Sequence, residues 1–373
     1  MQEQETLKIN KQTLPFLNIS LYLNNIKPVQ SLTIENTSET DSNQLEIKIS
    51  TDIPCIEPFN YSISIVPAKK DVKIPLENLK VNRDFLNKLS ETEKANLTIE
   101  VCEKEVSILK ETIVINIQPL EHFGGFQVFP ELIAAYITPN HPYIYHIKRK
   151  AIEILERQVL KTAFEGYQSN DPERVLQIMS AIYSAIQSEE IVYSSLPPGY
   201  EEMGQRLRLL NTIQQEKFGN CIDISLLFAA CLEAVDLNPI LIIVRDHAFV
   251  GCWLQDDKFS EVINDDKTAI TKRLSKGIRE MVAIEATSVC KGNNIKFSDA
   301  LNSGEAQLVQ KDDFLLSVDI KRARTLRIRP LPLLTNSIRT QLDEEAIKKT
   351  ETALMEKHFE IGTLYQDELL HDN

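Results

Sequence analysis

Glycine, paired cysteines and long apolar runs are all scarce in this sequence. Its 373 residues include 11 glycines and 16 prolines, too few for a fibrous or linker-rich protein. The 6 cysteines lie far apart without a CxxC pair, so we expect free thiols rather than a disulfide framework or a zinc site. No run of 18 apolar residues occurs, so no membrane-spanning helix is expected. No calcium-binding loop is recognisable either, and we expect neither a metal nor a cofactor.

Negative charge predominates in the composition. Lys and Arg number 41 against 54 Asp and Glu, which gives a formal net charge of −13 at pH 7. Such a chain repels phosphate backbones at long range, so general nucleic-acid binding is disfavoured. A hydrophobic content of 43% with 25% charged residues excludes a wholly disordered chain. The acidic segment 1–5 has no signal-peptide pattern, so we expect a soluble, cytoplasmic protein.

Alternation of apolar and polar residues predicts short β-strands in the first third of the chain. The segments with this alternation are Ile19–Leu23, Leu32–Ile34, Leu45–Ile49, Tyr61–Ile65, Leu97–Val101 and Ile113–Ile117. Six or seven strands within about 110 residues are typical of an immunoglobulin-like β-sandwich. We place this domain at residues 1–120, with a short helix at 82–89, and expect it to serve as a binding or spacer module.

Helical spacing replaces this alternation after Gly125. Helices are expected at 129–137, 143–160 and 172–188, with Pro142 and Pro172 at helix starts and Asp171 as an N-cap. One further helix, 220–235, is followed by strands at 240–244, 247–254, 281–285 and 314–320. The expected fold class is therefore α+β. We divide the remainder into a domain at 121–335, with a helical lobe at 121–200 and a core at 201–335, and a charged helical tail at 336–373.

Three residues in this second domain form a candidate catalytic set. Cys221 lies where a loop becomes a helix, and the free N–H groups there stabilise a thiolate. His247 begins an alternating strand and could act as the general base. Glu285 ends an apolar strand, where a buried carboxylate needs a partner, so it could orient the imidazole. The order along the chain is nucleophile, base, orienting acid.

An oxyanion formed by attack of the thiolate needs hydrogen-bond donors. The backbone N–H of Cys221 is one donor, and Gln215, six residues upstream, is our candidate for the second. Gln214 and Gln205 compete for this role. Asp223 could be a supporting acid, or it could serve the positive end of the helix.

The motif Gly219-Asn220-Cys221-Ile222-Asp223, with the apolar helix after it, resembles the nucleophile helix of transglutaminase-like enzymes of the papain type. Asp246-His247-Ala248-Phe249 resembles the histidine strand of that family, and Ile284-Glu285-Ala286-Thr287 resembles its Asp-Pro-Thr strand. Glu285 stands where the family has aspartate and Ala286 where it has proline. The resemblance covers about residues 200–290 and implies a papain-type fold with a Cys-His-acid triad.

A narrower resemblance covers nearly the whole chain. The segments 130–136, 139–142, 166–169, 204–208 and 328–332 are similar to the amino-terminal region of large bacterial helicase–nuclease proteins linked to phage defence. In those proteins, this region precedes a superfamily 1 helicase. The present chain has no Gly-x-x-x-x-Gly-Lys-Ser/Thr loop and therefore no such ATPase. It is either a fragment, or its motor is a separate polypeptide.

Taken together, the motifs predict a cysteine-dependent amide or peptide-bond hydrolase or an acyl transferase that forms an acyl-thioester. We favour a protease acting on a protein substrate in an anti-phage defence system, with a helicase or nuclease as a possible partner. The alternative is a non-catalytic module with this fold that docks a helicase or a phage protein.

A dense basic run lies near the end of the second domain, at Lys321, Arg322, Arg324, Arg327 and Arg329. Its simplest interpretation is a solvated strand face. The alternative is a docking patch for nucleic acid or an acidic partner.

Overall fold

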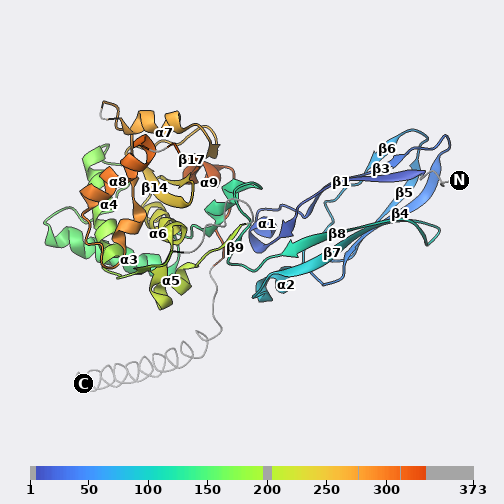
Figure 1. Cartoon of the computed structure of the whole chain (residues 1–373), viewed down its shortest axis with the longest axis horizontal. Helices are drawn as coiled ribbons and strands as arrows, with labels where there is room; N and C mark the ends of the chain where they lie inside the picture. Colours follow the sequence, from blue (N-terminus) through green and yellow to red (C-terminus); the bar gives the residue numbers. More distant parts are fainter. Residues whose placement is uncertain (1–5, 196–203, 276, 311, 333–373) are drawn as a thin grey trace, which may run out of the picture. The chain divides into compact units, whose positions relative to one another are not determined.

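A computed structural model describes residues 6–195, 204–275, 277–310 and 312–332 (Figure 1). The chain divides into a first unit, Met1–Leu331, and a second, Pro332–Asn373. The boundary expected near residue 120 lies inside the first unit. The helical tail expected at 336–373 lies outside the described residues. The first unit combines helices with several antiparallel sheets, so the α+β class is confirmed.

Two antiparallel sheets occupy the first 120 residues. The larger has the order β2–β8–β7–β4–β5, with only the short β2 parallel to its neighbour, and the smaller has the order β1–β3–β6. The strands are β1 (Leu7–Thr13), β2 (Phe16–Leu17), β3 (Val29–Asn36), β4 (Ser42–Thr51), β5 (Phe59–Val66), β6 (Asp71–Lys73), β7 (Glu93–Glu103) and β8 (Val106–Ile117). Alternate residues of β4, namely Leu45, Ile47 and Ile49, are buried, as the period of two predicts.

The segment 19–23 is a helix, α1 (Ile19–Leu23), and the strand predicted there is wrong. Asn18 caps the helix by accepting a hydrogen bond from the backbone N–H of Leu21, at 3.0 Å. Ile19, Ser20 and Leu21 are all buried, so the alternation of residue types does not separate an inner from an outer face. The cap and the surrounding core decide the conformation at this point. The helix predicted at 82–89 is present as α2 (Arg83–Lys88).

The helices predicted after residue 125 are present. η1 (Pro130–Tyr136) is a 3₁₀-helix, and α3 (Pro142–Arg157) and α4 (Pro172–Gln187) are α-helices. Proline is the first residue of each, which its fixed φ and missing N–H favour. The predicted N-cap Asp171 accepts from the N–H of Glu173 at 3.0 Å. His141 caps α3 in the same way, through its Nδ1.

The second half contains a five-stranded antiparallel sheet with the order β15–β17–β13–β14–β16. Its strands are β13 (Pro239–Val244), β14 (His247–Trp253), β15 (Ile263–Asn264), β16 (Met281–Ile284) and β17 (Phe314–Asp319). All residues of β13 are buried, because both faces of the sheet are covered. Helix α6 (Cys221–Glu233) packs against β13 and β14. This packing brings the start of α6 to the sheet.

Shorter elements surround this sheet. They are β9 (His122–Phe123), β10 (Val192–Tyr193), β11 (Gln205–Arg206), α5 (Leu210–Glu216), β12 (Phe218–Gly219), α7 (Lys267–Leu274), η2 (Ala286–Val289), α8 (Phe297–Gln310) and α9 (Ile320–Thr325). Within the described ranges, no helix is both long and apolar enough to cross a membrane.

Candidate active site

The nucleophile candidate is the first residue of α6. Asn220 is the N-cap, and its side chain accepts from the N–H of Asp223 while the Asp223 carboxylate accepts from the N–H of Asn220, both at 3.0 Å. This reciprocal capping box fixes where the helix begins. Cys221 is buried, with a residual exposure of 6%. Its thiol therefore lies at the positive end of a well-capped helix.

Asp223 also ties the preceding loop to this helix. Its fully buried carboxylate accepts from the backbone N–H of Arg208 at 2.9 Å and from the Arg208 guanidinium at 3.0 Å. The guanidinium lies 4.3 Å from the centre of the Phe218 ring. Asp223 thus caps the helix and pairs with a cation as well. Gly219 is buried against this turn, where a Cβ would meet Asp223 at 3.3 Å, so its small size serves packing.

Ser225 connects the nucleophile helix to the histidine strand. Its hydroxyl lies 2.7 Å from the carbonyl oxygen of Cys221 and 3.1 Å from that of Ala248, the residue after His247. His247 begins β14, which pairs with β13 and β16. Because these contacts are short and buried, the start of α6 is held close to the start of β14.

Glu285 follows β16 directly and meets the imidazole. The Nε2 of His247 lies 2.8 Å from Oε2 of Glu285. The other carboxylate oxygen accepts from the N–H and the hydroxyl of Thr287, at 3.1 and 2.6 Å. Nε2 is thereby engaged by Glu285, and Cys221 lies close enough to the imidazole to help raise its pKa. The structure thus brings together the three side chains singled out from the sequence.

Opposing effects act on the pKa values of His247 and Glu285. Burial alone would lower the pKa of His247, but hydrogen bonds and charge interactions with Cys221 and Glu285 raise it to about 9. Burial would raise the pKa of Glu285, yet the imidazole and Thr287 lower it overall. At neutral pH the site therefore contains an imidazolium beside a carboxylate. An imidazolium next to a thiol favours the thiolate.

Helix α8 supplies a residue that the sequence analysis missed. The side-chain amide of Gln307 donates to Oε2 of Glu285, the oxygen that also faces His247. Gly304, one turn earlier, packs so closely on β16 that a Cβ would lie 2.6 Å from the carbonyl oxygen of Ala283. The carbonyl of Ala300 accepts from the N–H of Glu285 at 3.0 Å. The one signal in the sequence is a glycine in a helical pattern, three residues before a glutamine.

Tyr193 is a second residue that the sequence analysis missed. It lies on β10, which runs parallel to β12 with Tyr193 opposite Gly219, two residues before the nucleophile. Burial raises the pKa of its hydroxyl, and Cys221, Glu285 and Cys290 lie close enough to raise that pKa further. The side chain nevertheless remains 42% exposed. No motif marks a tyrosine that lies so far upstream of the thiol along the chain.

The glutamines proposed for the oxyanion lie elsewhere. Gln215 and Gln214 are exposed on α5, and no hydrogen bond joins either to the three site residues in the described part of the chain. Gln205 lies on β11, opposite Phe123 of β9. Within the residues that the structure describes, no contact therefore supports the role predicted for Gln215.

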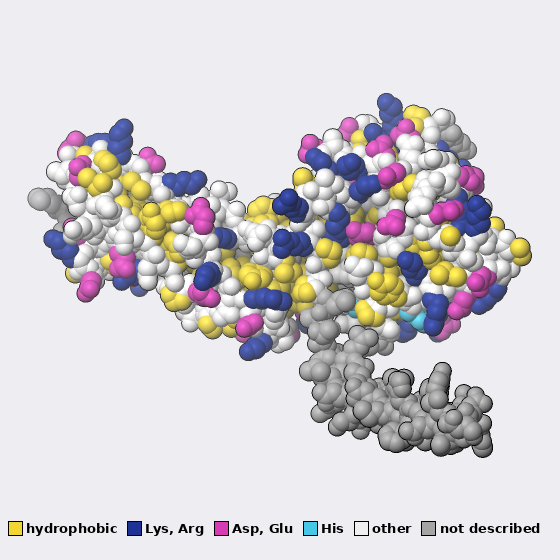
Figure 2. Space-filling view, turned by 180° about the vertical axis from the view of Figure 1, so that it is seen from behind, with side chains coloured by type: hydrophobic (Ala, Val, Ile, Leu, Met, Phe, Trp, Pro, Cys, Tyr) yellow, Lys and Arg dark blue, Asp and Glu magenta, His cyan; other side chains and the backbone are white. Residues whose placement is uncertain are grey.

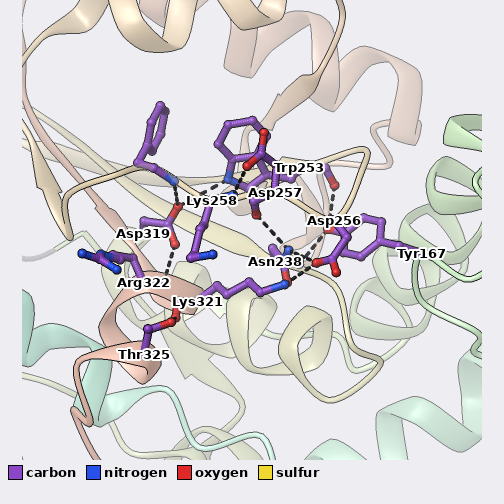
Figure 3. Close-up of polar contacts among 11 residues, drawn as sticks. Tyr167, Asn238, Trp253, Asp256, Asp257, Lys258, Asp319, Lys321, Arg322 and Thr325 are labelled. Carbon is purple, nitrogen blue, oxygen red and sulfur yellow. Dashed lines mark hydrogen bonds and ion pairs between the residues drawn. The ribbon is translucent and has the colours of Figure 1, made fainter.

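The basic run lies on a helix and the loop after it, and the strand face expected for it is wrong. Lys321, Arg322 and Arg324 belong to α9, whose N-cap is the buried Asp319. Lys321 pairs with Asp256 within a polar network shown in Figure 3. Arg324 donates twice to Glu233, at 2.8 and 3.0 Å, and to two backbone carbonyls. Two charges of the run are thus neutralised within the chain.

The remaining cysteines are packing residues by their surroundings. All are free and buried, and burial raises the pKa of Cys252 and Cys290 to about 12. Among the described residues, no group of three or more His, Cys, Asp or Glu side chains could hold a metal ion.

Comparison of the chain with protein-family models, curated proteins and solved structures gives no match.

Proposed function

We propose that this protein is a cysteine-dependent hydrolase or acyl transferase that acts on an amide or peptide bond. One observation carries the proposal: the imidazole of His247 lies 2.8 Å from the Glu285 carboxylate through Nε2, and Cys221 lies close enough to help raise its pKa. A thiol activated by an oriented histidine is the arrangement that acyl transfer to sulfur requires.

The reaction follows from these positions. The Cys221 thiolate attacks the carbonyl carbon, and the imidazolium of His247 gives its proton to the leaving amine nitrogen. Glu285 stabilises the imidazolium and holds its orientation. Water then resolves the acyl-thioester, which gives a protease or deamidase, whereas a lysine amine gives a crosslink. Proteolysis of a protein substrate is the outcome we favour.

The fold that we propose for this chemistry is the papain type in its transglutaminase-like form, preceded by an immunoglobulin-like sandwich. The capped helix bearing Cys221 packs on an antiparallel sheet that bears His247 and Glu285, which agrees with this assignment. By resemblance, we further propose a role in bacterial defence against phage, alongside a helicase or nuclease carried by the same or another chain.

The test compares covalent changes in a bacterial protein extract treated with the wild type, Cys221→Ala or Cys290→Ala. Cys290→Ala is the matched control, because this buried cysteine lies near the site and its pKa of about 12 keeps it protonated. Mass spectrometry of peptide termini should show new cleavage products with the wild type and the control. The Cys221→Ala sample should show none.

Products other than cleaved peptides would indicate another reaction of the same acyl-thioester intermediate. Conversion of glutamine to glutamate would indicate a deamidase, and lysine-linked peptides would indicate a transferase. Identical extracts after all three treatments would contradict catalysis. The alternative, a non-catalytic module that docks a helicase or a phage protein, would then be preferred.

A further inference from the structure

We propose that Tyr193 is a catalytic residue that donates a hydrogen bond to the oxyanion formed when Cys221 attacks a carbonyl group. This inference rests on the proposed function and assigns the donor for which Gln215 was a candidate from the sequence. It also predicts that the carbonyl oxygen of the substrate lies on the side of Cys221 that faces Tyr193.

The position of Tyr193 is set by backbone hydrogen bonds on two sides. On one side, the N–H groups of Val192 and Ser194 donate to the carbonyls of Lys217 and Gly219, at 2.8 and 2.9 Å. On the other side, the carbonyl of Ile191 accepts from the N–H of Lys291 at 2.8 Å. Strand β10 is thereby joined to the segment that leads into Cys221 and to the segment that follows Glu285 and η2. A tyrosine held in this way keeps a defined place beside the thiol.

The chemistry of the phenol suits an oxyanion donor. Burial and the neighbouring acidic groups raise the pKa of Tyr193 to about 12, so it stays protonated at neutral pH. A protonated tyrosine O–H can donate one hydrogen bond, and this hydroxyl lies near the sulfur that attacks the substrate carbonyl. Tyr193 as a whole residue is 42% exposed, so a substrate can approach its side chain from solvent.

The step transfers charge from sulfur to oxygen. As the carbon–sulfur bond forms, the π electrons of the carbonyl group move to its oxygen, and the negative charge leaves Cys221. The O–H of Tyr193 donates a hydrogen bond to this oxygen without losing its proton. The backbone N–H of Cys221 has no partner within its helix and can serve as the second donor. When the carbon–nitrogen bond breaks, His247 protonates the amine and the carbonyl group re-forms.

The experiment separates oxyanion stabilisation from activation of the thiol. Iodoacetamide alkylates a thiolate by displacing iodide, so no oxyanion forms. Acylation by p-nitrophenyl acetate requires an oxyanion and releases nitrophenolate. We would measure both rate constants for the wild type, Tyr193→Phe and the control Tyr145→Phe, whose hydroxyl lies on the exposed side of α3. Tyr193→Phe should lower the acylation rate constant about 10²-fold, a typical loss for one oxyanion donor, and leave alkylation within about threefold of wild type.

Two results would overturn the assignment. If both rate constants of Tyr193→Phe match the wild type, the hydroxyl has no role. If both fall by the same factor, Tyr193 supports only the structure around the thiol. A different failure concerns the proposed function: wild-type acylation no faster than that of Cys221→Ala would show that Cys221 is not an acyl acceptor, whatever Tyr193 does.

Discussion

The imidazole of His247 is subject to two opposed influences. Burial favours its neutral form, while the neighbouring Cys221 and Glu285 favour the imidazolium, and the second influence prevails. In the transglutaminase-like assignment that we propose, an aspartate would be usual where Glu285 stands. The longer glutamate still reaches the ring nitrogen, because Thr287 and Gln307 fix its carboxylate by donating hydrogen bonds to it. The departure in residue type is therefore accommodated by two further hydrogen-bonding groups.

The raised pKa of His247 predicts a loss of stability in alkali. Its pKa is higher in the folded state, about 9 against an ordinary 6.5, so its contribution is complete below pH 6.5 and disappears as the pH rises through 9. Between pH 6.5 and 9.5, urea unfolding should show the wild type losing roughly 2 kcal/mol more than His247→Gln. If the free energy of unfolding changed equally with pH in both proteins, His247 would not be held as an imidazolium.

Helix α8 positions the acid of the site through a close contact of backbones. Ala would be the better helix former at position 304, by about 1 kcal/mol. Its Cβ, however, would lie 2.6 Å from the carbonyl oxygen of Ala283 on β16. We therefore predict that Gly304→Ala lowers the free energy of unfolding by roughly 1–3 kcal/mol, measured in urea. Ser303→Ala, at an exposed position of the same helix, should change it by less than about 0.5 kcal/mol. A Gly304→Ala protein as stable as the wild type would show that the contact is loose.

Glu189 joins the helical layer to the segment before the nucleophile. Its carboxylate is nearly fully buried and accepts from Lys150 at 2.6 Å, Lys217 at 2.5 Å and the hydroxyl of Tyr143 at 3.2 Å. Nε2 of His146 lies 3.1 Å away. Burial alone would raise the pKa of Glu189, but the two lysines lower it to about 2. Lys217 ends α5 in a left-handed conformation, and β12 and Cys221 follow it. The carboxylate therefore supports the approach to the active site.

Removal of this buried charge should destabilise the protein. We predict that Glu189→Gln lowers the free energy of unfolding by roughly 1–3 kcal/mol at pH 7. This is less than the loss of a fully buried ion pair would cost, because both lysines are about one-third exposed and water screens their charges. The pKa of Glu189 is lower in the folded state, so its contribution is present above pH 4.5 and is lost as the pH falls toward 2. The two proteins should therefore converge in acid. The neighbouring Glu190→Gln is the control, because its pair with Lys291 is exposed and worth about 0.5 kcal/mol or less. Equal effects of the two substitutions would contradict the role of Glu189.

Over the whole molecule, charge is distributed rather than concentrated. On the face shown in Figure 2, Lys and Arg side chains are interspersed with Asp and Glu. Two members of the basic run pair within the chain, while Arg327 and Arg329 are exposed. Together with the net charge of −13, this distribution opposes attraction of a nucleic-acid backbone.

We accordingly predict little affinity for nucleic acid. A fluorescent DNA duplex titrated with the protein in 0.1 M salt should show no saturation up to about 100 µM, the weak limit of non-specific binding. The control is Arg327→Glu/Arg329→Glu, which should behave as the wild type does. Micromolar affinity that weakens with salt and is abolished in the double variant would instead establish a docking patch.

The sequence predicts the helices and strands of this protein well wherever the pattern that indicates them lies within a few residues. Helical spacing predicts the helix at 220–235, which bears Cys221, and alternation predicts the strand that begins with His247. The apolar strand before Glu285 is predicted in the same way. These signals arise from hydrogen bonds and side-chain periodicity within a few residues, which depend little on the rest of the fold. A clear local error, at Ile19–Leu23, occurs where both faces of a segment are buried, so that alternation no longer separates an inner from an outer face.

Only the tertiary structure decided which side chains meet. Tyr193 and Gln307 reach the site from opposite directions along the chain, one well before Cys221 and the other well after Glu285, and no local pattern distinguishes them from surface residues. Their positions depend on strand pairing and on the close approach allowed by Gly304. The charge of His247 likewise follows from burial and from two neighbours that are distant in the sequence. Such contacts form only when distant elements pack, because packing sets the distances and the solvent exclusion that give them strength.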